Sequence, residues 1–127
     1  MRNSETNGRH EEKEQNKNNE ERTRRICELN DRFRRTGEGG RQLTTPGIQE
    51  MGLVEMLVIR QLVASYDAFC EHNDPYGEHD FGNLKYHDEK ILWKIDYYDA
   101  TLTAGSPDPS DHQVTTRVLT IMLANEY

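Results

Sequence analysis

The chain has 127 residues, enough for one domain, with 33% apolar and 31% charged residues and a formal net charge of −7. The negative charge belongs to residues 42–127, where fourteen acidic residues outnumber five basic ones, a net of −9. A body of this charge repels a phosphate backbone, so we expect no direct binding of nucleic acid. We also expect neither a signal peptide nor a membrane span, because no apolar run is long enough. Cys27 and Cys70 lack metal-ligand spacing, which indicates reduced thiols and a cytoplasmic location.

Residues 1–19 contain no Ile, Leu, Val, Phe, Tyr or Trp, so we predict a disordered polar tail there. Residues 20–127 are predicted to form a single domain. It begins with a helix over residues 20–36, in which Ile26 and Phe33 belong to one apolar stripe. We expect the many arginines of this helix to form a charged face in water.

The next predicted elements are a short strand, a long helix and a two-stranded hairpin. Residues 41–45 are a strand candidate that ends at a Pro-Gly turn. The apolar run over residues 51–69 predicts a central helix, and its breadth predicts burial on more than one side. Residues 81–86 and 91–98 are predicted to pair as a hairpin, because apolar and polar residues alternate along them.

The second strand of the hairpin supplies the predicted anchor of the core. Ile91, Trp93, Ile95 and Tyr97 are expected to point inward, because they share one face of a pleated strand. Trp93 is the largest of these side chains and the only tryptophan.

A third helix is predicted at the end of the chain. Asp108 followed by proline is typical of a helix start, and Val114, Val118 and Ile121 give a helical stripe. We therefore predict a small α+β domain in which an antiparallel sheet around hairpin 81–98 carries about three helices on one face.

Six motifs are distinctive: NDRFRRTGEGGR (30–41), LTTPGI (43–48), NDPYGEHDFG (73–82), WKIDYYD (93–99), GSPDP (105–109) and TRVLTIMLANEY (116–127). In these motifs the sequence resembles a family of bacterial proteins classed as a domain of unknown function. That resemblance implies a gene of plasmids and other mobile elements, often beside genes linked to anti-restriction, and it carries over no catalytic residue.

The first candidate site is the polar turn at residues 73–82, where Asp-Pro-Tyr-Gly favours a type I turn. Glu78, His79 and Asp80 follow this turn, and Asp96 lies on the second hairpin strand. If the hairpin register brings these four together, they are candidate ligands of a divalent metal. Alternatively, His79, Asp80 and Asp96 are candidate catalytic residues, with His79 as a general base oriented by a carboxylate.

The second candidate is a protein-binding surface of tyrosines among acidic side chains. An acidic face can occupy a site evolved for nucleic acid, so a basic nucleic-acid-binding protein is the expected partner. The sequence favours this non-enzymatic role, as an accessory or anti-defence protein of a mobile element, over catalysis. The candidate binding residues are Asp74, Tyr76, Glu78, Tyr97, Tyr98, Asp99 and Asp108.

The third interpretation needs no ligand. Tyr97, Tyr98, Asp99 and the loop at residues 106–109 would then hold a corner of the fold, because buried tyrosine hydroxyls need hydrogen-bond partners. The sequence leaves these three interpretations open.

Overall fold

The computed structural model of the protein describes the backbone of residues 2–127 and the side chains of residues 11–127. It has the predicted α+β architecture, with helices and one four-stranded sheet. The elements in chain order are α1 (Arg2–Thr36), β1 (Gly40–Thr44), α2 (Pro46–Gln49), α3 (Leu53–Ala64), β2 (Phe81–Tyr86), β3 (Glu89–Tyr98), β4 (Thr116–Leu123) and the 3₁₀ turn η1 (Ala124–Glu126).

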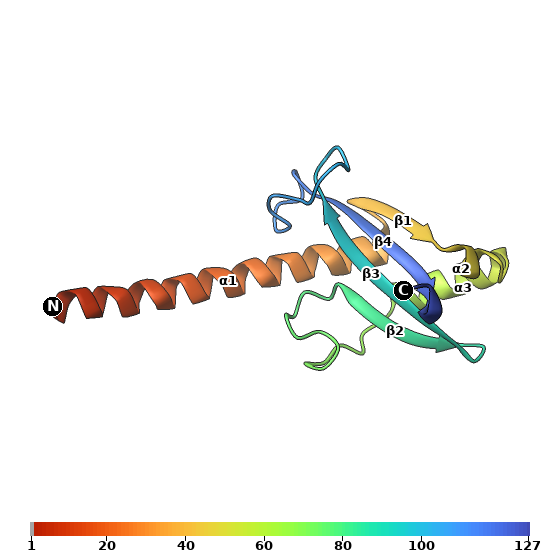
Figure 1. Ribbon diagram of the computed structural model, residues 1–127, viewed down its shortest axis with the longest axis horizontal. Coiled ribbons are helices and arrows are strands. Elements are labelled where there is room, and N and C mark those ends of the chain that lie inside the picture. Colours follow the sequence, from red (N-terminus) through yellow and green to blue (C-terminus); the bar gives the residue numbers. More distant parts are fainter. Residues whose placement is uncertain (1) are drawn as a thin grey trace.

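The sheet is mixed, with strand order β1-β4-β3-β2 (Figure 1). The antiparallel prediction is confirmed for the β2–β3 hairpin, to which β4 adds a second antiparallel pair. It is wrong for β1, which pairs with β4 in parallel. A parallel pair requires a long crossover connection. Here α2, α3 and the β2–β3 hairpin supply that connection.

The predicted third helix is wrong, because the segment that follows Asp108 forms a loop and then β4. Leu119 and Ile121 of β4 point to the helices, while Val118 and Met122 are buried on the opposite face. A strand buried on both faces has a continuous apolar run, which periodicity alone does not distinguish from a helix.

The β2–β3 hairpin is as predicted. Its turn consists of His87 and Asp88, whose φ angles of 49° and 65° place both in the left-handed region. Two left-handed residues define the type I′ turn that matches the twist of paired strands. Tyr86 therefore pairs with Glu89, and β3 begins two residues earlier than expected.

Trp93 is fully buried at the centre of the core, as predicted. It lies between sheet and helices, where strand residues meet side chains from α1 and α3. The core consists of Phe33, Ile48, Ile59, Val63, Ile91, Trp93, Ile95, Leu119 and Ile121.

The central helix α3 is buried on one side only, so the prediction of burial on several sides is wrong. Ile59 and Val63 are completely buried, whereas Leu53, Val54 and Leu57 are 71%, 70% and 54% exposed. In Figure 1, α1 and α3 both lie behind the sheet.

Residues 2–19 are helical in the structure, where the sequence predicted disorder. Glu, Lys, Arg and Gln are good helix formers, and a hydrogen bond from Gln15 to Asn19 joins neighbouring turns. The side chains of residues 11–20 are all exposed, and this half of α1 extends away from the body (Figure 1).

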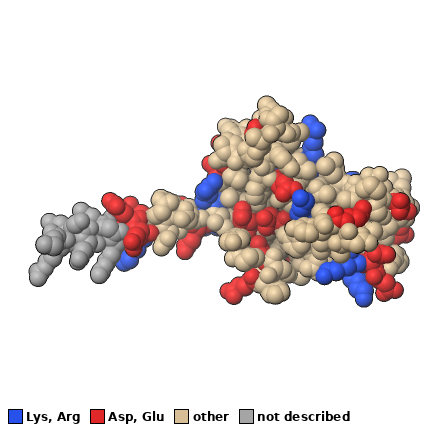
Figure 2. All heavy atoms as spheres, in the orientation of Figure 1, with Lys and Arg blue, Asp and Glu red and all other residues tan. Residues whose placement is uncertain are grey.

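The second half of α1 packs on the sheet through Ile26, Asn30, Phe33 and Arg34. The expected charged face in water is wrong for Arg34, which is only 2% exposed. Among the described residues, no helix has both the length and the apolar character needed to cross a membrane. Acidic side chains are more widespread than basic ones on the face of the body shown in Figure 2.

Candidate functional site

A group of polar side chains lies between α1 and the inner face of the sheet, and we call it the polar seam. Helix α1 contributes three of its members within about one turn, and the loop before β2 contributes three more. Its residues are Asn30, Asp31, Arg34, Asp74, Glu78, His79, Tyr97 and Arg117.

Asn30 is the centre of one half of the seam and is completely buried. Its amide nitrogen donates to the Glu78 carbonyl at 2.9 Å and to the Tyr97 hydroxyl at 2.8 Å. Its amide oxygen accepts a 2.6 Å bond from Arg117 Nε. The Tyr97 hydroxyl in turn donates to the Glu78 carboxylate at 3.2 Å. Burial raises the pKa of Tyr97, so the hydroxyl remains a donor at neutral pH.

His79 is the centre of the other half. Its Nδ1 lies 2.9 Å from Asp31 Oδ1, and its Nε2 lies 3.7 Å from Asp74 Oδ2. The ring stacks on Phe69 with 3.8 Å between centroids and 4° between planes. Since a carboxylate only accepts, Nδ1 carries a proton in this arrangement. His79 also adopts a left-handed φ of 57°, and Asp74 accepts its backbone N–H.

Arg34 joins this half to the core. It donates to the carbonyls of Val63, Ala64 and Tyr66 at the end of α3 and to Asp31 Oδ1 at 2.9 Å. The guanidinium also lies over the rings of Phe69 and Trp93, 5.4 Å and 5.2 Å from their centroids. Such contacts make Arg34 a structural cation, because its charge is surrounded by carbonyls, a carboxylate and aromatic faces.

The carboxylates next to the seam repel one another. Burial, with the charge of Asp80, raises the pKa of Glu78, and burial, with the charges of Asp74 and Asp96, raises the pKa of Asp80. Asp96 is paired with Lys94 at 3.0 Å on the outer face of the sheet. The predicted set is therefore divided, because His79 turns toward α1 while Asp96 faces the opposite side of the sheet.

The group of described side chains with metal-binding spacing is a different one. Ligand atoms of Cys27, Asp31 and His79 all lie within 4.8 Å of one another. Burial and the charge of Asp31 raise the pKa of Cys27 to about 11, so its thiol is protonated at neutral pH. Of the expected metal ligands, only His79 belongs to this group.

The predicted tyrosine and acid surface is also divided. Tyr97 points inward and Tyr98 outward, because they are neighbours in β3. Tyr76 is 80% exposed on its loop beside α1. Asp99 and Asp108 each accept bonds from residues two to four positions further on, which is typical of residues that fix turns. Those bonds lower the pKa of both carboxyls.

Residues 44–126 match the family model described as "Protein of unknown function (DUF3768)". The chain belongs to this family. The match covers more than half of the chain and agrees with the resemblance described above. No curated protein and no solved structure matches the chain.

Three of the eight residues of the polar seam come from α1, outside the matched part of this DUF3768 chain, and the sequence analysis did not predict their role. Asn30, Asp31, Arg34 and Arg117 were not expected as site residues. One signal was present, because Asn30 follows Ile26 by four positions and precedes Phe33 by three, which places it on the apolar face. A polar residue on that face indicates a buried hydrogen-bond centre.

The second notable surface of this DUF3768 chain is the uncovered side of α3. The side chains of Leu53, Val54, Leu57, Val58 and Leu62 are all exposed, and we call them the α3 face. They occur at i, i+1, i+4, i+5 and i+9, which places them along one side of the helix.

Proposed function

We propose that this DUF3768 chain is a protein-binding module whose partner docks on the α3 face. The observation that carries the proposal is the exposure of five large aliphatic side chains on one side of one helix. Soluble monomers rarely expose a contiguous apolar surface of this kind without an interaction for it. Full burial of a Leu or Val side chain contributes about 1.5–3 kcal/mol, so a partner helix or groove would gain substantially by covering this face.

The charge of the chain supports a basic partner. Residues 42–127 carry a net charge of −9, and exposed Glu50 and Asp67 flank the two ends of α3. The partner we propose has an apolar patch bordered by Lys and Arg, as nucleic-acid-binding proteins often have. On a mobile element, such a module would serve as an accessory or anti-defence protein, and the location we propose is the cytoplasm.

The test compares two leucine variants with the same chemical change. Leu57 lies in the α3 face and is 54% exposed, whereas Leu43 lies on β1 and is 53% exposed. A photo-cross-linking residue at position 54 would capture the partner from the host, and the purified partner would then be titrated against each variant. We expect Leu57→Glu to abolish binding and Leu43→Glu to retain it, with wild-type affinity that falls as salt rises.

Three results would contradict this proposal. A captured protein without a basic border, or equal affinity of both variants, would remove the argument from charge or from the α3 face. A concentration-dependent dimer in light scattering that Leu57→Glu dissociates would show that a second copy of the chain occupies the face.

A second candidate function is the binding of a divalent metal, which the spacing of Cys27, Asp31 and His79 favours. Thiolate, imidazole and carboxylate are the ligands that Zn²⁺ takes in proteins. Asp74 lies 3.7 Å from the other ring nitrogen of His79, Nε2, and does not belong to this group of three. A metal ion at this position would compete with Arg34 for the Asp31 carboxylate, to which Arg34 already donates a hydrogen bond.

Cobalt distinguishes a metal site from this ion-pair network. On addition of Co²⁺, a thiolate ligand gives a sulfur-to-metal absorption band in the near ultraviolet. We expect the band in the wild type and in Cys70→Ser, whose cysteine is exposed and outside the group, but not in Cys27→Ser. Absence of the band in the wild type would leave His79 and Asp31 with a structural role alone.

A further inference from the structure

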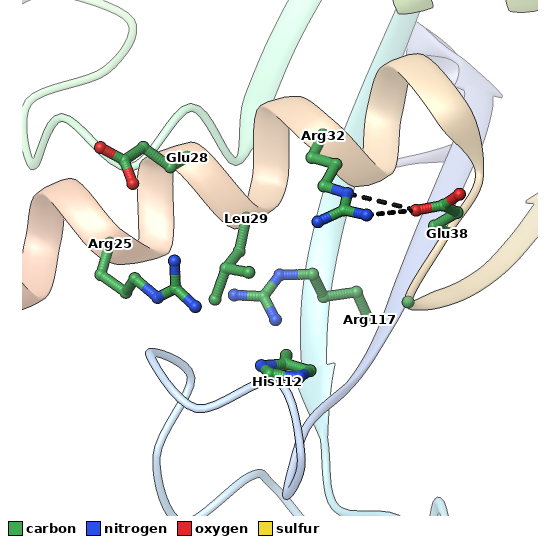
Figure 3. A pocket seen from close by; sticks show the side chains of 8 residues that line it. Arg25, Glu28, Leu29, Arg32, Glu38, His112 and Arg117 are labelled. Carbon is green, nitrogen blue, oxygen red and sulfur yellow. Dashed lines mark hydrogen bonds and ion pairs between the residues drawn. The ribbon is translucent and has the colours of Figure 1, made fainter.

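A pocket of about 450 Å³ lies on the other side of α1 from the His79 half of the polar seam (Figure 3). One face of α1 forms its wall, and the loop before β4 and the start of β1 close it. The lining residues are Arg25, Glu28, Leu29, Arg32, Glu38, Gly39, His112 and Arg117.

Arg117 is the unusual member of this lining because it is a buried charge without a direct ion pair to any described residue. Burial lowers its pKa, and the nearby charge of Glu78 offsets this only in part. It is only 2% exposed, and it donates to the side chain of Asn30 and to the carbonyl of Pro109 at 2.5 Å. No carboxylate among the described residues lies within ion-pair distance of it. Buried guanidinium groups are usually paired with an anion, since desolvation of an isolated charge is costly.

The groups around Arg117 increase this positive charge. In Figure 3, the guanidinium groups of Arg25 and Arg117 and the ring of His112 turn toward the same space, and Glu28 points away from it. The side chain of Arg25 makes no hydrogen bond or ion pair with any residue whose side chain the structure describes, and no dashed line reaches it in Figure 3. Arg32 differs, because it is engaged by Glu38 at 2.8 Å.

We propose that this pocket binds a small phosphate-type anion, either inorganic phosphate or a phosphate monoester, between the guanidinium groups of Arg25 and Arg117. Two guanidinium groups match the charge and the several acceptor oxygens of phosphate better than those of a single carboxylate. His112, on the loop before β4, lies across the pocket from α1 and offers a third hydrogen-bond donor. Leu29, between the arginines, gives the organic part of a monoester an apolar surface. A polyanion is disfavoured, because the net charge of −9 on residues 42–127 would repel its remaining phosphates.

The experiment uses a pair of neighbouring arginines. Arg24 and Arg25 are both exposed on α1, but only Arg25 lines this pocket. Arg25→Gln and Arg24→Gln therefore remove the same charge from the same helix and differ only in the pocket, and neither removes a buried group. Calorimetric titration with inorganic phosphate, phenyl phosphate, acetate and a short DNA duplex at constant ionic strength would compare both with the wild type.

We expect the wild type and Arg24→Gln to bind phosphate with affinities within about twofold, and Arg25→Gln to bind at least about tenfold more weakly, the factor that corresponds to about 1.4 kcal/mol. Phenyl phosphate should bind at least as tightly as phosphate. Equal losses in both variants would indicate only general electrostatic attraction and would overturn the proposal. Absence of heat with phosphate, equal affinity for acetate, or tighter binding of the duplex would each overturn it as well.

Discussion

Gly82 is the residue on which the packing of Trp93 depends most directly. The two are paired across β2 and β3, and a Cβ atom on Gly82 would lie 2.4 Å from Trp93 Nε1. The Trp93 ring is fully buried among the side chains of the core. Gly82 therefore allows the largest side chain of the core to lie flat against its neighbouring strand.

We expect Gly82→Ala to lower the free energy of unfolding by about 1–3 kcal/mol, as overpacking of a filled core does. Chemical denaturation followed by circular dichroism measures this. Gly105→Ala is the control, because a Cβ atom there would contact only the Tyr97 carbonyl at 4.0 Å. Equal stability of both variants would show that the indole ring can shift.

Asp80 gives a prediction about pH, because its folded-state pKa is raised by burial and by neighbouring carboxylates. A raised pKa means that the ionised form is disfavoured in the folded state. The wild type therefore loses stability as pH rises from the unfolded value of about 3.9 through the folded pKa. Asp80→Asn lacks this loss, so we expect it to be more stable than the wild type at pH 7 and to lose the advantage on acidification.

Thermal unfolding at a series of pH values would measure the difference. Asp67→Asn changes an exposed carboxylate and serves as the control. A stability advantage of Asp80→Asn that persisted below pH 4 would contradict the assignment to ionisation.

At this scale the sequence was informative about apolar residues and misleading about polar ones. Trp93 was expected at the core because strand alternation and size both indicate it. Arg34 was expected in water, since an arginine is rarely fully buried. Its burial depends on three carbonyl groups at the end of α3, whose position relative to α1 no local pattern specifies.

At the scale of elements, Arg34 is the main polar link between α1 and α3. Its loss would leave three carbonyls without their side-chain donor and Asp31 without its cationic partner on α1. We expect Arg34→Ala to destabilise the protein by about 3–5 kcal/mol, the usual effect of breaking a buried ionic group from one side. Urea denaturation would measure it.

Arg35→Ala is the matched control, because Arg35 is the next residue of α1 and is exposed. We expect its effect to remain below about 0.5 kcal/mol, as for an ordinary surface substitution. A similar loss of stability in both variants would indicate that the helix itself, rather than the link to α3, had been weakened.

Element types were predicted where the periodicity was unambiguous and missed where burial was two-sided. The β2–β3 hairpin was recognised because polar residues alternate with apolar ones. Strand β4 was taken for a helix because both of its faces are apolar. Helix α3 was recognised, but apolar residues on its far side were taken as buried, because a sequence pattern does not distinguish a core contact from an exposed binding face.

At the scale of the molecule, α1 consists of a packed half and a projecting half. All side chains from residue 11 to residue 20 are exposed, whereas Ile26 and Phe33 are buried. An isolated helix is only marginally stable in water, so the projecting half lacks the packing that maintains the other half. We expect removal of residues 1–15 to leave the unfolding temperature unchanged within a few degrees.

Amide exchange on the complete chain would test the same division. Amides of residues 11–20 should exchange much faster than those of residues 26–34, because local opening of the projecting half exposes no apolar core. A large drop in unfolding temperature on truncation, or equal protection of both halves, would show that the projecting half contributes to the fold.

The arrangement of the sheet and of the polar seam could not be predicted, because both depend on contacts between distant parts of the chain. Asn30 meets Arg117, and Gly40 pairs with the same arginine across the parallel strands. Local propensity does not select such partners. For the same reason the four predicted metal ligands are not all brought together, since His79 turns toward Asp31 of α1 and away from Asp96.

The central position of β4 has a consequence for the order of folding. It is the last strand to be synthesised, yet it lies between β1 and β3 and pairs with both. Until it leaves the ribosome, β1 has no hydrogen-bonding neighbour and the hairpin has an open edge. The sheet of the nascent chain can therefore close only after β4 (Thr116–Leu123) has been synthesised, and until then its unpaired edges are the targets that chaperones and proteases recognise.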